Sequence, residues 1–133
     1  MTKHKVHCDC GEVAITMEGL PKVHAFCHCE DCRELLQVPF HSVLVWDEDV
    51  VSFLKGEDNI IEFQHPTKRM KRIFCKDCGD VIYNTNAMGW KLVSQLMFRK
   101  CNDDTLPDGF ESNAHFYYGR RIVNVDDEIP KRG

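Results

Sequence analysis

Short runs of β-branched and aromatic residues recur along the chain, and each run is bounded by residues typical of turns. These runs predict strands at 12–17, 22–26, 40–46, 50–54, 60–64, 69–74, 81–84, 92–98, 115–118 and 121–125. Residues 55–59 and 106–109 have the composition of turns. Only residues 30–36 fit a helical pattern, so the sequence predicts a mainly β protein.

The length of 133 residues suits one domain, and no repeat, low-complexity tract or linker divides the chain. We therefore expect residues 1–133 to form a single domain. Apolar residues make up 43% of the sequence, so the core is modest and metal crosslinks would add usefully to its stability. No stretch approaches the roughly 20 apolar residues that a membrane span requires.

The net charge of -4 argues against nucleic acid or an anionic membrane as the main partner, because both favour a basic excess. We interpret the basic run at 68–72 as the solvated face of a strand. The amino end leads into a cysteine-bearing segment without an apolar signal region, so we expect a cytoplasmic, reducing location. Cysteines in such a compartment indicate metal binding rather than disulfides.

Two of the cysteine pairs have the form of zinc knuckles. Cys75 and Cys78 are separated by two residues and followed by Gly79, whose freedom at positive φ suits a turn that aims N–H groups at sulfur. Cys8 and Cys10 are the natural second pair, and they are also followed by a glycine. The spacing therefore predicts a structural zinc held by Cys8, Cys10, Cys75 and Cys78.

A third group, Cys27, Cys29 and Cys32, has no obvious fourth ligand beside it. Three protein ligands with one open position are typical of catalytic zinc sites. The alternatives are a closed site with a fourth ligand from elsewhere, or a cluster that binds no metal. The candidates for that fourth ligand are Cys101, His28, His24 and His115.

The three cysteine motifs lie at residues 8–11, 27–33 and 72–79. They match the patterns C-x-C-G, C-H-C-x-x-C-R and R-x-F-C-x-x-C-G, in that order. In this respect the chain, over roughly residues 6–126, resembles the glutathione-dependent formaldehyde-activating family, whose domain is also found in centromere protein V.

The resemblance implies a β-tent, in which antiparallel sheets wrap around zinc, and two zinc ions per chain. It assigns the structural zinc to Cys8, Cys10, Cys75 and Cys78, and the catalytic zinc to Cys27, Cys29 and Cys32. The implied activity is that of S-(hydroxymethyl)glutathione synthase, a carbon–sulfur lyase that joins formaldehyde, or a related small carbonyl compound, to the thiol of glutathione.

The chain departs from the family pattern on the side where substrate is expected. Glu30 replaces a small polar residue, residues 34–37 lack a common glycine, and Tyr118 and its neighbours replace a common Trp near the carboxyl end. These departures affect the expected identity of the substrate more than the expected metal binding.

Several other side chains near the middle motif have two interpretations each. Glu30 and Asp31 either transfer protons or simply favour the first turn of a helix. Arg33 pairs with a substrate carboxylate or with a surface acid. His28, between two ligands, is expected to point away from the metal, and His115 lines a pocket or packs as a hydrogen-bonded residue.

Two non-catalytic functions also fit a zinc-stabilised β fold. One is a binding module for another protein, which a second closed four-ligand site would favour. The other is a sensor of thiol reagents, because zinc-bound thiolates can be oxidised.

Overall fold

Residues 2–133 are described by a computed structural model, in which they form two β-sheets and two short α-helices. The strands are β1 (Lys3–His7), β2 (Ala14–Glu18), β3 (Val23–Cys27), β4 (His41–Trp46), β5 (Val51–Lys55), β6 (Ile60–Gln64), β7 (Lys71–Cys75), β8 (Val81–Thr85), β9 (Lys91–Ser94) and β10 (His115–Phe116). The helices are α1 (Glu30–Leu36) and α2 (Gln95–Cys101), with 3₁₀ turns η1 (Glu48–Val50) and η2 (Tyr118–Arg120). No helix in this part of the chain is long and apolar enough to cross a membrane.

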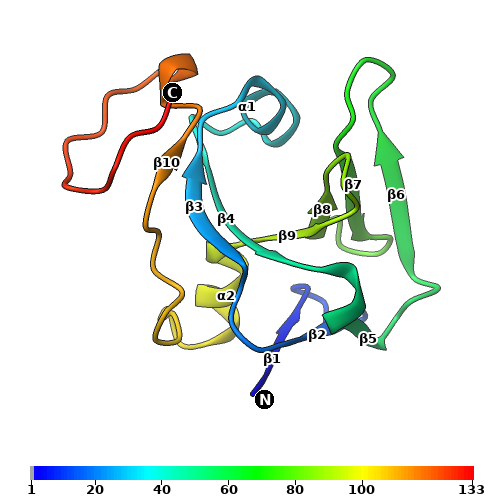
Figure 1. The fold of residues 1–133 in the computed structure, drawn as a ribbon. Coiled ribbons are helices and arrows are strands. Elements are labelled where there is room, and N and C mark those ends of the chain that lie inside the picture. The colour runs from blue at the N-terminus through cyan, green and yellow to red at the C-terminus, as the bar shows by residue number, and fades with distance from the viewer. Residues whose placement is uncertain (1) are drawn as a thin grey trace.

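The larger sheet has seven strands in the order β10-β3-β4-β9-β8-β7-β6, and the smaller sheet has the order β1-β2-β5. All neighbouring strands are antiparallel except β10 and β3. In Figure 1 the larger sheet bends along β4 and β9, so that β3 and β10 form one side and β6 to β8 the other. The smaller sheet closes the end between them. The fold is mainly β, as the residue pattern predicts, and its tent-like arrangement agrees with what the resemblance implies.

Strand β4 is buried on both faces, and each face contributes to a different core. On one face Trp46 stacks on Phe98 of α2 at a ring distance of 5.6 Å, and Phe110 packs edge-on against Phe98 at 5.2 Å. On the other face Val43 belongs to the apolar cluster that includes Cys32 of α1. The sheet therefore holds α1, and the cysteines at its start, against its second face.

The carboxyl-terminal segment folds back beside β10, as Figure 1 shows. The N–H of His115 donates to the carbonyl of Pro130, and the N–H of Arg132 donates to the carbonyl of His115, both at 2.8 Å. The N–H of Tyr118 donates to the carbonyl of Arg132 at 2.7 Å. These bonds fix the end of the chain along the outer edge of β10, whose other edge pairs with β3, the strand that leads into the middle cysteine motif.

The predicted helix at 30–36 and the predicted strand at 60–64 are confirmed with the same bounds. The prediction of one strand over 92–98 is wrong, because β9 ends at Ser94 and α2 follows. The Ser94 hydroxyl accepts a hydrogen bond from the N–H of Leu96 at 3.1 Å and so caps the helix. The apolar residues after this cap form a helical face rather than the continuation of a strand.

Two further differences lie near the chain ends. Residues 121–125 do not form a strand; the guanidinium of Arg121 lies over the ring of Tyr118 at 4.4 Å instead. Strand β1 was not predicted, because Val6 is its single apolar residue. That valine is fully buried, and pairing with β2 supplies the rest of the strand's stabilisation.

The turn between β5 and β6 packs tightly against the segment that follows Cys10. Gly56 in this turn has φ +81, and a Cβ atom there would overlap the backbone carbonyl of Glu12. Gly89 has almost the same φ of +77, but a Cβ atom there would meet only the Glu48 carboxylate at 4.0 Å. The two glycines therefore share the conformational requirement and differ in available space.

We expect Gly56→Ala to destabilise the protein much more than Gly89→Ala. Both variants carry the strain of a non-glycine residue at positive φ, roughly 1 kcal/mol or more, but only Gly56→Ala must also displace backbone atoms. Urea unfolding of the zinc-loaded proteins measures the difference. Equal losses of stability in the two variants would contradict the close approach of this turn to Glu12.

Candidate metal centres

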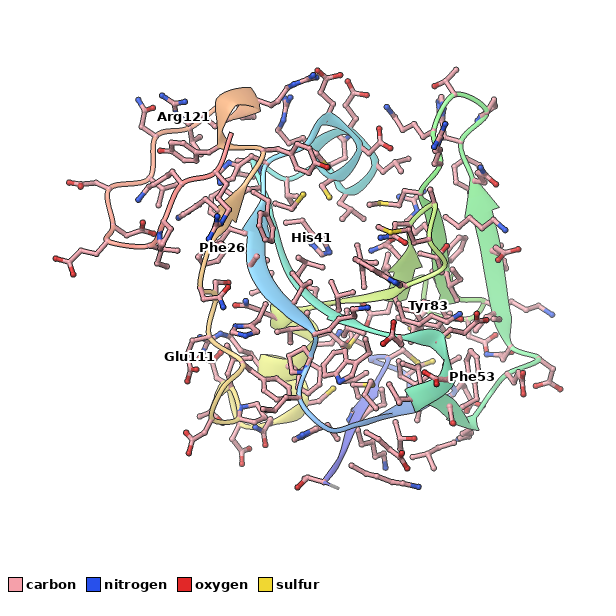
Figure 2. The ribbon with its side chains drawn as sticks, in the orientation of Figure 1. Phe26, His41, Phe53, Tyr83, Glu111 and Arg121 are labelled. Atoms are coloured by element: carbon pink, nitrogen blue, oxygen red, sulfur yellow. The ribbon has the colours of Figure 1, made fainter. Side chains whose placement is uncertain are left out.

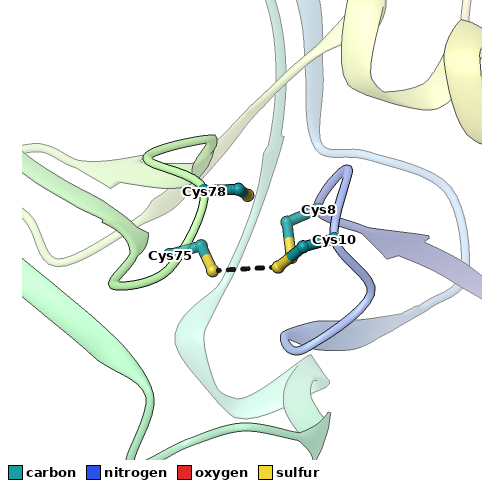
Figure 3. Close-up of side chains that lie close together, drawn as sticks. All are labelled: Cys8, Cys10, Cys75 and Cys78. Atoms are coloured by element: carbon teal, nitrogen blue, oxygen red, sulfur yellow. Dashed lines mark hydrogen bonds between the residues drawn. The ribbon is translucent and has the colours of Figure 1, made fainter.

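Four thiols from two distant parts of the chain converge where the two sheets meet. Cys8 and Cys10 lie in the turn after β1, Cys75 ends β7, and Cys78 lies in the turn that follows. The four Sγ atoms all lie within 4.8 Å of one another. Cys10 Sγ is 3.6 Å from both Cys8 Sγ and Cys75 Sγ, and Figure 3 shows the two loops facing each other across these sulfurs.

Backbone N–H groups in both loops point at the sulfurs. The N–H of Val13 donates to Cys8 Sγ at 3.3 Å. The backbone N–H groups of Cys10 and Asp80 lower the pKa of the Cys78 thiol to about 7. Gly79, at φ +76, makes the tight turn that presents such groups. The loops therefore favour thiolates, which are the form that binds metal.

Lys100 of α2 connects the two cysteine loops electrostatically. Its ammonium group contacts the carboxylates of Asp9, at 2.8 Å, and Asp80. The Lys100 hydrogen bond and charge lower the pKa of Asp9. Asp80 also accepts a hydrogen bond from the backbone N–H of Asp9 at 3.0 Å. The loops are thus held together by polar contacts as well as by the clustering of their thiols.

The geometry of the four thiols fits a tetrahedral zinc ion. Zn–S bonds of about 2.3 Å at tetrahedral angles place neighbouring sulfurs about 3.8 Å apart. The two sulfur separations of 3.6 Å are close to that value. All eight cysteines are free thiols.

A second group of three thiols lies where β3 meets α1. Cys27 ends β3, Cys29 is the N-cap residue of α1, and Cys32 lies in the first turn of the helix. Their Sγ atoms lie within 4.8 Å of one another. Cys29 Sγ accepts a hydrogen bond from the N–H of Cys32 at 3.4 Å, so the thiol takes the place of the usual Ser or Asp cap.

This surrounding stabilises a thiolate on Cys29. Hydrogen bonds from the side chains of Cys27 and Cys32 lower its pKa, and the backbone N–H groups of Cys32 and Asp31 act in the same direction. The hydrogen bond with Cys29 and burial raise the pKa of Cys27, and hydrogen bonds with Cys27 and Cys29 raise the pKa of Cys32. Neighbouring thiolates would repel one another, and a cation placed among the three sulfurs would relieve that repulsion.

Within residues 2–133 no fourth His, Cys, Asp or Glu joins the three thiols. Cys101 lies far from them, beside β1, where its Sγ is 3.4 Å from both the N–H and the carbonyl of His7. The ring of His24 is hydrogen-bonded to the carbonyl of Glu111. The described residues form a three-thiol cluster at this position.

His28 and His115 form a buried hydrogen-bonded chain behind the three thiols. His28 Nε2 is 2.9 Å from His115 Nδ1, and His115 Nε2 is 2.9 Å from a carboxylate oxygen of Asp127. Both rings are fully buried. The expectation that His28 points away from the cluster agrees with this pairing, and His115 has the packed, hydrogen-bonded role rather than that of a free pocket residue.

The charged residues of α1 make specific contacts. Glu30 is paired with Arg120 at 2.8 Å, and Asp31 lies 3.6 Å from Lys68. Both acids lie in the first turn of the helix. Arg33 forms no ion pair within residues 2–133, and its Nε donates to the carbonyl of His28 at 3.1 Å. This bond helps to hold the chain between Cys27 and Cys29.

An open hollow of about 330 Å³ lies beside Cys29. Its other lining residues are Glu30, Asp31, Tyr117 and Arg120. Tyr117 has a left-handed backbone, with φ 55, and its side chain is largely exposed. Neither Tyr117 nor Arg120 was identified as a site residue from the sequence, although Arg120 lies in the stretch from Tyr118 that departs from the family pattern and Tyr117 precedes it.

Two buried polar side chains that line one cavity were also missed from the sequence. His41 lies opposite Cys27 in the β3–β4 pair, and Asn84 lies on β8. Burial lowers the pKa of His41 to about 4. A lone His or Asn within an apolar strand gives no distinctive sequence signal. Only the folded sheet brings His41 next to Cys27 and Asn84 into the same cavity as His41.

Comparison with known proteins adds a family and a fold. The sequence model described as "Glutathione-dependent formaldehyde-activating enzyme" matches residues 3–120. A crystal structure of a Rhodobacter sphaeroides protein superposes with a TM-score of 0.57 at 22% identity, covering 71% of this chain and 86% of that one, which shows a shared fold. No curated protein matches the chain at a significant level of sequence similarity.

We expect Cys75→Ser to prevent stable folding, because the four-thiol cluster ties β7 to the loop after β1 and zinc contributes roughly 10 kcal/mol in small domains. The matched control is Cys101→Ser, which removes a thiol outside both clusters and should fold with about two zinc ions per chain. Circular dichroism melts and metal analysis measure both. A Cys75→Ser protein with a cooperative, native-like melt would contradict this role.

Proposed function

Because the chain belongs to the glutathione-dependent formaldehyde-activating enzyme family, we propose that it is a zinc-dependent carbon–sulfur lyase. It adds a thiol, glutathione, to formaldehyde or a related small carbonyl compound. The observation that supports this activity is the three-thiol cluster, which lacks a fourth side-chain ligand in residues 2–133 and adjoins an open hollow at Cys29.

In this proposal residues 1–133 form one zinc-binding domain of cytoplasmic location with two different metal sites. Cys8, Cys10, Cys75 and Cys78 hold a structural zinc. Cys27, Cys29 and Cys32 hold a second zinc and leave one position open. When bound there, zinc would supply a Lewis acid that lowers the pKa of an incoming thiol, so that the thiolate form exists near neutral pH.

The reaction makes one bond and moves one proton. The substrate sulfur attacks the carbonyl carbon, the carbon–sulfur bond forms, and the carbon–oxygen π bond breaks. The thiol proton ends on the oxygen, which gives an S-(hydroxyalkyl) product. Rigid placement of the cluster supports this step: Arg33 and His115 fix the His28 segment between two of the thiols, so the site does not have to be ordered when substrate binds.

The open hollow suits a thiol that carries carboxylates. The guanidinium of Arg120 lies at this hollow, and its ion-pair partner within residues 2–133 is the exposed carboxylate of Glu30. A substrate carboxylate can replace Glu30 as its partner, because an exposed ion pair of this kind contributes little to stability. Arg120 is therefore our proposed contact for a carboxylate of glutathione.

Cys29→Ser tests the enzyme directly. We expect this variant to fold, to retain about one zinc ion per chain, and to lose glutathione-dependent consumption of formaldehyde. The three ligands lie so close in sequence that their site closes only a small loop and constrains the unfolded chain little. Thermal melts, metal analysis and an aldehyde assay are compared with those of Cys101→Ser. If Cys29→Ser unfolds as Cys75→Ser does, the cluster is structural and a zinc-stabilised binding module becomes the better interpretation.

Arg120→Gln tests the choice of thiol. We expect the KM for glutathione to rise about five- to tenfold with kcat little changed, because one charge-assisted hydrogen bond is lost. The KM for 2-mercaptoethanol, which has no carboxylate, should stay the same. Lys3→Gln, which removes the cation of an exposed ion pair with Glu18 on the smaller sheet, is the control. An unchanged KM for glutathione in Arg120→Gln would exclude this contact.

A further inference from the structure

A cavity of about 150 Å³ lies between the end of α1 and the strands β4, β8 and β9. Its walls are mostly apolar, with Leu36, Val38 and Leu92 among them. Its lining contains no Lys, Arg, Asp or Glu. The cavity therefore differs in character from the charged hollow at Cys29, and it suits an uncharged group.

Two buried polar side chains, His41 and Asn84, line this apolar cavity. Their exposed fractions are 6% and 2%. His41 Nε2 and Asn84 Oδ1 are shielded from solvent, and neither has a hydrogen-bond partner in the described residues. Unpaired buried polar atoms of this kind are rare and destabilising unless a ligand or another group satisfies them.

The strand register places both side chains on the face that carries the three thiols. His41 is directly opposite Cys27 in the β3–β4 pair, so their side chains lie on the same face. Asn84 pairs with Leu92, and Leu92 pairs with Val45 of β4. Val45 is four residues after His41 on the same strand, so Asn84 and His41 lie on the same face of the sheet. Figure 2 shows the His41 side chain in the space between α1 and β8. None of the three thiols lines the cavity, but His41 in its wall is the cross-strand neighbour of Cys27 and so connects the cavity to the thiol cluster.

We propose that this cavity binds the carbon body of the carbonyl substrate, and that the preferred substrate is an uncharged aldehyde of about the size of benzaldehyde. The inference rests on the thiol–aldehyde addition proposed above. An apolar protein cavity of about 150 Å³ accommodates a benzene ring. His41 donates a hydrogen bond to the substrate oxygen, and Asn84 Oδ1 accepts one from the hydroxyl group that the addition creates. The thiol enters from the charged hollow and the aldehyde occupies the apolar cavity.

Binding is measured first with benzyl alcohol, which has the ring and the hydroxyl group but cannot react. We expect it to shift the NMR signals of Leu92 and Asn84 in the zinc-loaded protein, and to bind about tenfold more weakly to Asn84→Leu. That variant should be at least as stable as the wild type, since it replaces an unpaired buried amide by an apolar group of similar shape. Wild-type affinity in Asn84→Leu, or no binding to the wild type, would overturn the proposal.

A second pair of variants avoids any change inside the core. Leu96 lies at the rim of the cavity and is 67% exposed, while Leu20 is 66% exposed and does not line it. Leu96→Trp should weaken benzyl alcohol binding, and Leu20→Trp should leave it unchanged. Equal affinities of these two variants for benzyl alcohol would count against the cavity as the binding site.

Turnover separates this inference from the proposed function. With glutathione, the wild type should consume benzaldehyde with a higher kcat/KM than formaldehyde, and Leu96→Trp should lower that ratio. If formaldehyde is consumed and benzaldehyde is not, the inference about substrate size is overturned while the proposed function stands. If neither aldehyde is consumed, the proposed function fails, and with it the assignment of the cavity to a carbonyl substrate, even where benzyl alcohol binds.

Discussion

The convergence of Cys8, Cys10, Cys75 and Cys78 is the contact on which the rest of the architecture depends. It joins the turn after β1, in the smaller sheet, to the β7–β8 turn of the larger one. Cys10 and Cys75 are 65 positions apart in sequence, so this contact closes a long loop at a considerable entropic cost. Backbone N–H groups and the Lys100 ion pairs prepare the thiols for a metal that can offset that cost.

With the sheets fixed in this way, β4 serves two purposes at once. Its one face completes the aromatic core around Trp46, and its other face carries His41 and Val43 toward α1 and the three thiols. One face of β4 thus contributes to the main core, and the other faces the cluster at which we propose that the reaction takes place.

Local features of the sequence predicted local structure well. The spacing of the cysteines anticipated both thiol groups, and the pattern at 30–36 gave α1 with its observed bounds. The helix α2 was missed because its signal is a single capping residue, Ser94, inside an apolar run. Asp127, Arg120, His41 and Asn84 were missed because each reaches the site only through strand pairing or through the fold-back of the carboxyl-terminal segment. No periodicity in the sequence encodes contacts of that kind.

The two thiol clusters also differ in when they can first assemble. As the chain leaves the ribosome, the three-thiol cluster is complete once Cys32 has emerged, since its ligands span one strand end and one helical turn. The four-thiol cluster must wait for Cys78, by which time most of both sheets has been synthesised. The amino-terminal part of a chain is the first to become available for folding during synthesis. In the proposed function, the cluster that contributes less to holding the fold together is therefore the first whose ligands are all available. The ion of the four-thiol cluster has to be acquired later, before the sheets can be locked in register.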